Sequence, residues 1–273
     1  MLSSLPFWLA SVVLFILGAS VGSFLNVMVY RSMRDQDWVS SRSKCDHCGQ
    51  KLKWFDNLPL LSYLLLRGKS RCCRQSLGLT HPVVELLTGS LFVWWFWGGT
   101  LFFKLVQSPL STLQPIFWLL VGVLLIGVLI ADWLYMIIPD LLVGALILMA
   151  FFYRAILVSL GAMQPLDLLY MFLSTLSLAA FFAGLWLVTK GRGLGFGDVK
   201  YAVAMGLILG WPRILVAVFL AFILGSLVSL FLIFLKKKQF GQRIAFGPFL
   251  VVGTVLALVM GSQLWEWYWR LML

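Results

Sequence analysis

Apolar residues occur in eight long runs along the chain, separated by segments that are rich in polar and charged residues. The runs cover residues 6–30, 82–103, 113–131, 141–158, 166–188, 199–209, 214–235 and 246–265. A helix that crosses the hydrocarbon core of a bilayer needs about 20 apolar residues, and all but one of the runs approach or exceed this length. The pattern predicts an all-α polytopic membrane protein with about eight transmembrane helices.

The sixth run, residues 199–209, is too short to cross a bilayer unaided. A glycine-rich segment precedes it, and this segment would have to lie at membrane depth to extend the run. Bare backbone is not tolerated in lipid, so protein or water would then have to surround the segment.

The composition supports a membrane protein over a soluble one. The chain has 273 residues, of which 62% are hydrophobic and only 11% charged. Its mean hydropathy is +0.98. An ordinary soluble core of this size cannot bury so much apolar surface, whereas lipid can cover it.

Lys and Arg residues favour one orientation of the spans. If residue 30 ends the first span on the cytoplasmic side, the cytoplasmic segments are 31–81, 132–140, 189–200 and 236–245, and they hold 17 of the 21 basic residues. The remaining four are Lys104, Arg154, Arg213 and Arg270. We therefore expect both termini on the outer side of the membrane. The first run lacks a basic n-region and a small-residue cleavage site, so we expect it to be a retained span.

The net charge of +11 follows mostly from this topology. It adds a preference for anionic membrane lipid. The sequence shows no basic groove interleaved with aromatic residues, so we expect no nucleic-acid partner.

The one sizeable soluble segment, residues 31–81, contains every cysteine of the chain: Cys45, Cys48, Cys72 and Cys73. In the reducing cytoplasm these thiols are not expected to form disulfides. Cys45 and Cys48 have the Cys-x-x-Cys spacing that lets two thiolates share one zinc ion. Adjacent cysteines supply the other half less well, because neighbouring side chains diverge. A zinc site and a set of reduced thiols therefore both remain open, and neither His47 nor His81 is expected to be a ligand.

Carboxylates outside this segment are few, and most have ordinary explanations. They are Glu85, Asp132, Asp140, Asp167, Asp198 and Glu266. Asp167 and Glu266 lie near outer span ends, where solvated charges are common. Asp140 follows a proline and opens a span, as a helix-capping residue does.

Asp132 and Asp198 are harder to explain as structural residues. Asp132 ends an unbroken apolar span with no Lys or Arg nearby in sequence, and Asp198 follows four glycines at alternate positions, residues 191–197. The predicted topology puts both at the cytoplasmic membrane boundary. The glycines allow close approach of another backbone, such as an extended peptide, although a plain loop also accommodates them. They match neither the phosphate-binding nor the dinucleotide-binding glycine pattern.

Two neighbouring carboxylates cannot both ionise easily. One keeps a proton while the other acts as a base, which is the arrangement that activates water against a peptide carbonyl. The pair therefore indicates peptide-bond hydrolysis.

Seven motifs occur in an order that resembles the bacterial type IV prepilin peptidase family, whose members are membrane aspartyl proteases with a Gly-x-Gly-Asp signature. They are GSFLNV at 22–27, CDHC at 45–48, NLPLLSYLLLRGKS at 57–70, HPVVELLTG at 81–89, ADWLYMIIPD at 131–140, GLGFGDVK at 193–200 and FGPFL at 246–250. The resemblance implies that Asp132 and Asp198 are the catalytic pair. It also implies the substrates: type IV prepilins or type II secretion pseudopilins, cut on the cytoplasmic side of the bacterial inner membrane.

The resemblance further implies two cofactors. Family members commonly methylate the new N-terminal amine with S-adenosylmethionine, but no residue of this sequence is assigned to that reaction. The family's second Cys-x-x-Cys would occupy positions 70 and 73, and this chain has Ser70 there. The expected zinc ligands are therefore Cys45, Cys48 and Cys73, with Cys72 in place of the missing cysteine, and loss of the metal is the alternative.

Two other functions are alternatives to a peptidase. An ion-coupled transporter also carries isolated acids in its spans, but usually near the midplane and with repeated halves. A non-catalytic assembly factor of a pilus or secretion system would need neither acid. We expect three parts: a first transmembrane helix at 6–30, a cytoplasmic cysteine-containing domain at 31–81 and a seven-helix peptidase core at 82–273.

Overall fold

The computed structural model describes residues 6–34, 36–37, 44–45, 47–102, 110–237, 239, 242 and 244–272. Contacts divide the chain into two compact units, Met1–Gly127 and Val128–Leu273, which are described separately. In the described parts of the chain the structure is nearly all-helical, with two isolated β-bridges, Lys44–Lys51 and Lys69–Ser76, and no longer strand. This confirms the predicted fold class.

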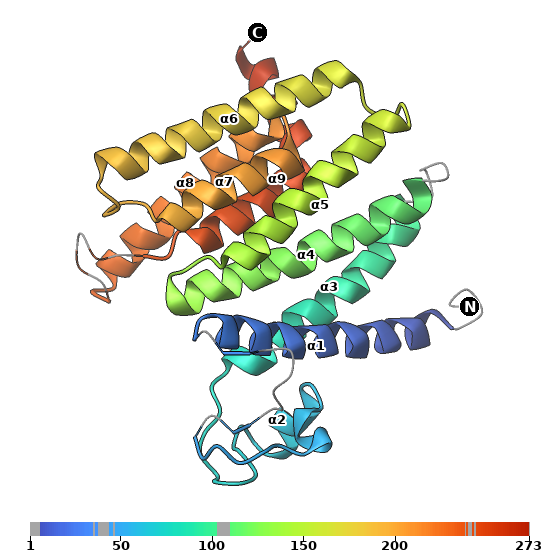
Figure 1. Ribbon diagram of the computed structural model, residues 1–273, viewed down its shortest axis with the longest axis vertical. Coiled ribbons are helices and arrows are strands. Elements are labelled where there is room, and N and C mark those ends of the chain that lie inside the picture. The colour runs from blue at the N-terminus through green and yellow to red at the C-terminus, as the bar shows by residue number, and fades with distance from the viewer. Residues whose placement is uncertain are drawn as a thin grey trace. The chain divides into compact units, whose positions relative to one another are not determined.

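The helices follow the apolar runs. They are α1 Phe7–Ser32, the 3-10 helix η2 Trp54–Asn57, α2 Leu61–Leu65, α3 Thr80–Phe102, α4 Leu110–Tyr135, α5 Asp140–Ser159, α6 Pro165–Val188, α7 Phe196–Leu209, α8 Arg213–Phe234 and α9 Gly247–Met272 (Figure 1). Among the described residues, 6 helices are long and apolar enough to cross a membrane, namely α1, α4, α5, α6, α8 and α9. The expected count of eight spans is not confirmed, because α3 and α7 form but do not meet these criteria. Lys104 lies outside the described residues.

In the first unit, α1 packs against α3 through small residues. A Cβ atom at Gly22 would lie 2.1 Å from the Thr88 Oγ1 atom, and one at Gly89 would lie 2.8 Å from the Phe15 ring. Such close approach is typical of helix pairs in membranes, where glycine lets two backbones come together. Contacts of Phe7 with Phe96 and of the Asn26 side chain with the His81 carbonyl show that the two helices run antiparallel.

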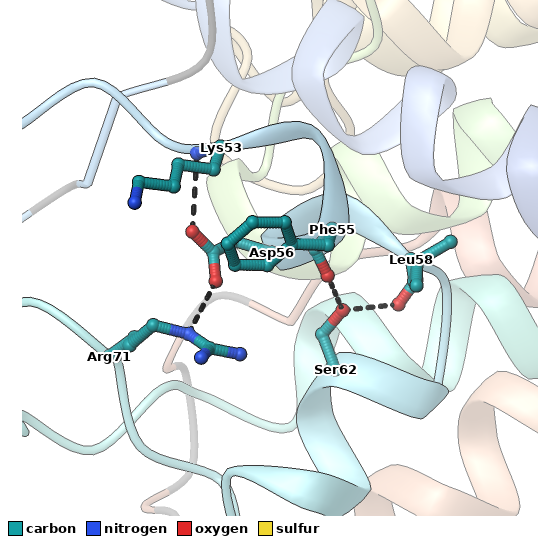
Figure 2. A network of polar contacts seen from close by, with 6 residues as sticks. All are labelled: Lys53, Phe55, Asp56, Leu58, Ser62 and Arg71. Carbon is teal, nitrogen blue, oxygen red and sulfur yellow. Dashed lines mark hydrogen bonds and ion pairs between the residues drawn. The ribbon is translucent and has the colours of Figure 1, made fainter.

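The segment between α1 and α3 carries η2, α2 and the four cysteines. Polar contacts hold it together, and Figure 2 shows six residues of this network: Lys53, Phe55, Asp56, Leu58, Ser62 and Arg71. The Asp56 carboxylate accepts hydrogen bonds from the Arg71 Nε at 2.8 Å and from the Lys53 backbone N–H at 3.2 Å. The Ser62 hydroxyl lies within hydrogen-bond distance of the Phe55 and Leu58 carbonyls, at 3.1 and 2.7 Å.

In the second unit, α7 packs against α5, α6, α8 and α9 (Figure 1). Ten of its 14 residues are buried. A helix of that length spans only about 21 Å. The surrounding helices give this short element the protein environment that lipid would not provide.

Close contacts fix both the middle and the end of α7. A Cβ atom at Gly206 would lie 2.4 Å from the Thr175 Oγ1 atom on α6. At the C-terminal end, the Arg154 guanidinium of α5 donates to the Leu207 and Ile208 carbonyls at 3.3 and 2.6 Å. A cation at this end satisfies carbonyls that lack intrahelical partners. Arg154 therefore holds α7 in place.

Candidate active site and metal centre

Asp132 lies near the C-terminal end of α4 and is buried, with 5% of its surface exposed. Its Oδ2 atom accepts a 2.8 Å hydrogen bond from the backbone N–H of Gly247, the first residue of α9. A Cβ atom at residue 247 would lie 2.6 Å from the same oxygen. The absence of a side chain at Gly247 therefore lets the N-terminus of α9 approach the carboxylate, where helix N–H groups favour negative charge.

Asp198 lies in the first turn of α7 and is also buried, with 6% of its surface exposed. Its Oδ2 atom accepts a 3.0 Å hydrogen bond from the Gly195 backbone N–H. This contact satisfies a donor just before the helix and fixes the direction of the side chain. Each carboxylate is thus held by the backbone N–H of a glycine.

The segment that follows Asp132 packs against the first turn of α7. A Cβ atom at Gly197 would lie 3.1 Å from the Ile138 Cβ, so a larger residue would require Ile138 to shift by a few tenths of an ångström. Beside this contact, the Lys200 Nζ forms a 2.6 Å ion pair with the Asp140 carboxylate. The two sequence motifs, 131–140 and 193–200, are therefore neighbours within one unit.

Asp132 and Asp198 belong to the same unit, and the charge of Asp132 acts on the Asp198 carboxyl group. Both groups are withdrawn from water, and two interacting buried carboxyl groups favour a state in which only one of them is ionised. One protonated and one ionised carboxyl group can act together as general acid and general base.

Several acidic residues lie where the sequence pattern indicated. Asp167 and Glu266 are exposed, as expected for solvated charges. Asp140 lies in the first turn of α5, but it also pairs with Lys200, a partner that is 60 positions away in sequence.

Gly247 is a site residue to which the sequence assigns no role, because its contact with Asp132 joins residues 115 positions apart. In the sequence, only the motif FGPFL at 246–250 marks the region around Gly247.

The four cysteines form a second cluster, in the first unit. The Sγ atoms of Cys45, Cys48, Cys72 and Cys73 all lie within 4.8 Å of one another. The Cys45–Cys73 and Cys48–Cys72 pairs are 3.9 and 3.1 Å apart. Four thiolates around one zinc ion, each about 2.3 Å from it, have separations of this order. The donor set therefore fits a tetrahedral metal site.

Two turns with the same hydrogen bonds present these thiols. In the first turn, the Cys45 N–H donates to the Gln50 carbonyl at 2.9 Å and the Gly49 N–H donates to the Cys45 carbonyl at 2.9 Å. In the second, the Ser70 N–H donates to the Gln75 carbonyl at 2.8 Å and the Arg74 N–H donates to the Ser70 carbonyl at 2.9 Å. Ser70 thus occupies the place that Cys45 has in the first turn.

Cys72 lies inside the second turn and brings the fourth sulfur to the cluster. The Ser70 hydroxyl does not replace it among the thiols but lies 2.9 Å from the Cys73 Sγ atom, within hydrogen-bond distance. Burial raises the pKa of the Cys45 thiol while the backbone N–H groups of Cys48 and His47 lower it, and the net pKa is about 6. The hydrogen bond with Cys48 raises the pKa of Cys72 to about 12. Cys45 therefore becomes a thiolate more readily than Cys72 does.

Two family profiles match the chain. The bacterial peptidase A24 N-terminal domain matches residues 16–98, which include the cysteine cluster. The type IV leader peptidase family matches residues 118–230, which include Asp132 and Asp198.

Full-length relatives match as well. The chain is 30% identical to the prepilin leader peptidase/N-methyltransferase of Pseudomonas aeruginosa, over 93% of this chain and 91% of the relative. It is 31% identical to the protein of that name from Pectobacterium carotovorum subsp. carotovorum, over 90% and 92%. The chain belongs to the type IV leader peptidase family. The protein of the same name from Aeromonas hydrophila is 29% identical over 96% of this chain and 94% of the relative. No solved structure matches the chain.

Membership of the type IV leader peptidase family confirms the predicted family and the predicted activity class, a membrane peptidase. Together with six apolar helices it indicates an integral protein of the bacterial inner membrane. A transporter function has no support from these matches.

Proposed function

We propose that this protein is a prepilin leader peptidase in which Asp132 and Asp198 form the catalytic pair. The observation that carries this proposal is the burial of both carboxylates in one unit, where each is held by a glycine N–H and the charge of Asp132 acts on Asp198. The names of the relatives supply the substrate class: prepilins, to which we add the pseudopilins of type II secretion. Cleavage takes place on the cytoplasmic side, where the basic residues are concentrated.

The two carboxyl groups have different roles in hydrolysis, one as general base and one as general acid. The ionised one takes a proton from water as the water oxygen attacks the scissile carbonyl carbon, and the protonated one donates its proton to the carbonyl oxygen. As the tetrahedral intermediate collapses, the C–N bond breaks and a carboxyl group returns a proton to the leaving amine. The Gly247 and Gly195 N–H groups hold the two side chains in position throughout.

Lys200 is not assigned to the reaction itself. Its ammonium group is paired with Asp140, on the exposed side of the same two segments. The pair ties the start of α5 to the first turn of α7, so Lys200 acts as a positioning residue for Asp198, two residues before it.

We also propose that the protein methylates the new N-terminal amine, because its relatives carry N-methyltransferase in their names. S-adenosylmethionine would supply the methyl group. Its transfer to the neutral amine would release S-adenosylhomocysteine and a proton, and no residue of this chain is assigned to that reaction. Cleavage must come first, since it creates this amine.

We assign a structural zinc ion to Cys45, Cys48, Cys72 and Cys73. The support is the close grouping of their sulfur atoms and the two matching turns that present them. Bound metal would join two turns that are about 25 residues apart in sequence and so stabilise the segment between α1 and α3. Membrane lipid is the other partner that we propose, and nucleic acid is not one.

One experiment tests cleavage and methylation separately. The purified protein is incubated with a prepilin, with and without S-adenosylmethionine, and the product is weighed by mass spectrometry. We expect loss of the leader peptide in both reactions and a further gain of one methyl group only with S-adenosylmethionine. An intact prepilin in both reactions would contradict the peptidase proposal, and a cleaved but unmethylated product would contradict methylation alone.

A further inference from the structure

A buried hydrogen bond joins α7 to α9 within the second unit. The hydroxyl groups of Tyr201 on α7 and Thr254 on α9 lie 3.0 Å apart, and both residues are fully buried, with 0% of their surface exposed. Tyr201 directly follows the motif GLGFGDVK, and Thr254 follows FGPFL, so neither residue belongs to a motif of the sequence. Such a contact fixes the alignment of two helices, because any shift would leave a buried hydroxyl group without a partner.

The direction of this hydrogen bond follows from a second one. The Thr254 Oγ1 atom also lies 2.7 Å from the Leu250 carbonyl oxygen, which can only accept a hydrogen bond. Thr254 has a single hydroxyl proton, so its side chain donates to Leu250 and accepts from the Tyr201 hydroxyl group. The hydrogen bonds therefore run from α7 to Leu250, which lies in the first turn of α9.

This link lies near the two groups that set the geometry of the proposed catalytic pair. Tyr201 comes three residues after Asp198 on α7, and residues at this spacing lie on the same face of a helix. Thr254 comes two turns after Gly247 on α9, whose backbone N–H holds Asp132. The link is about 4.5 Å along α7 from Asp198 and about 10 Å along α9 from Gly247. A shift of α7 along α9 would therefore move Asp198 relative to the N–H group that holds Asp132.

Other contacts tie α7 to different helices. The ion pair of Lys200 with Asp140 joins its first turn to α5, and Arg154 of α5 contacts its C-terminal end. The hydrogen bond between Tyr201 and Thr254 instead joins α7 to the helix whose N-terminus contacts Asp132.

We propose that Tyr201 and Thr254 are positioning residues for peptide-bond hydrolysis. They fix α7 against α9 and so set the separation of Asp132 and Asp198, without contact with the substrate. This inference rests on the proposed peptidase function and adds two residues to it.

Tyr201→Phe tests the link directly. The variant keeps the ring and removes the hydroxyl group, and it leaves no buried donor unpaired, because Thr254 still donates to Leu250. We therefore expect it to fold. Cleavage of a prepilin is measured with full-length protein in detergent that elutes like the wild type in size-exclusion chromatography. We expect kcat to fall by about tenfold and KM to stay within about twofold of the wild type, since displaced carboxylates impair the chemical step more than substrate binding.

Three further variants separate the link from a general effect of buried hydroxyl groups. Thr254→Val added to Tyr201→Phe should change kcat by less than about twofold, because the hydrogen bond is already lost. Thr254→Ser keeps the hydroxyl group and should retain the wild-type kcat. Thr175→Val is the matched control: Thr175 on α6 is buried, and its hydroxyl group donates to the Met171 carbonyl of the same helix at 2.7 Å. This control should also cleave at the wild-type rate.

Four results would overturn the inference while the peptidase proposal still stood. They are a kcat of Tyr201→Phe within about twofold of the wild type, a raised KM at unchanged kcat, an equal loss in Thr175→Val, and a further loss of about tenfold in the double variant. A wild type that leaves the prepilin intact would instead contradict the peptidase proposal itself.

Discussion

At the scale of single residues, two glycines give the candidate active site its geometry. Gly195 and Gly247 each direct a backbone N–H at a buried carboxylate, so the positions of Asp198 and Asp132 depend on main chain rather than on flexible side chains. A site held in this way is preorganised, because no long side chain has to be ordered when the substrate binds.

Gly247→Ala tests this role. The added Cβ atom would lie 2.6 Å from the Asp132 Oδ2 atom, so the carboxylate must move and lose its hydrogen bond. Displacement of a reacting group by about 1 Å costs on the order of 100-fold in rate, and we expect kcat for prepilin cleavage to fall by about that factor while KM stays nearly constant.

Gly144→Ala is the matched control. Gly144 lies in α5, and a Cβ atom there would meet nothing within 4 Å. The control should cleave at the wild-type rate, and its only expected change is a gain in stability of up to about 1 kcal/mol from helix propensity. An unchanged kcat in Gly247→Ala would show that the contact with Asp132 does not matter.

The acidic pair could be predicted from the sequence because isolated carboxylates at the ends of apolar runs are rare and costly. Gly247 could not be assigned a role in the same way. Its significance arises from a contact across 115 positions, and glycine carries no chemical group that reveals its partner. Glu85 is one of few carboxylates in the sequence, but its burial and its hydrogen bond from the Leu60 N–H, 25 positions away, appear only in the fold.

At the scale of elements, the two cysteine turns show how a changed motif keeps its geometry. The sequence raised doubt about the metal because Ser70 replaces a cysteine that the resemblance predicts. In the structure the second turn keeps the hydrogen bonds of the first, and Cys72 brings a fourth sulfur into the cluster from within the turn. Adjacent side chains usually diverge, so sequence spacing alone could not establish this.

We expect Cys72→Ser to weaken zinc binding strongly. Structural zinc sites have apparent binding free energies of about 10–16 kcal/mol from four ligands, so removal of one thiolate should lower the affinity by about 100-fold or more. Zinc content per protein, measured by mass spectrometry of the metal at a fixed chelator concentration, reports this change.

The double variant Ser70→Cys/Cys72→Ser provides the rescue. Because Ser70 has the place of Cys45 in its turn, a cysteine there should restore four thiols and one zinc ion per chain. A wild-type protein that contains no zinc would contradict the assignment, and full zinc content in Cys72→Ser would show that three cysteines suffice.

Among the helices, the short sixth run was predicted least completely. Its apolar pattern identified α7, but only packing against α5, α6, α8 and α9 explains why 14 residues form a stable buried helix. In the sequence, Arg154 is only one of four basic residues outside the predicted cytoplasmic segments. In the structure, it also caps the C-terminal end of α7. Both features depend on tertiary neighbours, which helical periodicity does not reveal.

At the scale of the whole molecule, the distribution of Lys and Arg residues is the basis for the proposed orientation. Alkaline phosphatase, which is active only outside the cytoplasm, is fused after residue 239 or after residue 272. We expect activity only in the second fusion, because the α8–α9 connection carries basic residues and the C-terminus is proposed to lie outside. The reverse result would invert the topology and move the proposed cleavage to the other side of the membrane.

The central claim is that Asp132 and Asp198 together hydrolyse the leader peptide bond. The most direct measurement is the rate of prepilin cleavage, followed by mass spectrometry, for Asp132→Asn, Asp198→Asn and the control Asp167→Asn, whose side chain is exposed at the start of α6. General acid–base groups contribute about 10²–10⁴-fold each, so we expect a loss of about 10³-fold or more in the first two variants and the wild-type rate in the control. Wild-type cleavage by either Asp132→Asn or Asp198→Asn in the membrane-inserted protein would contradict the account.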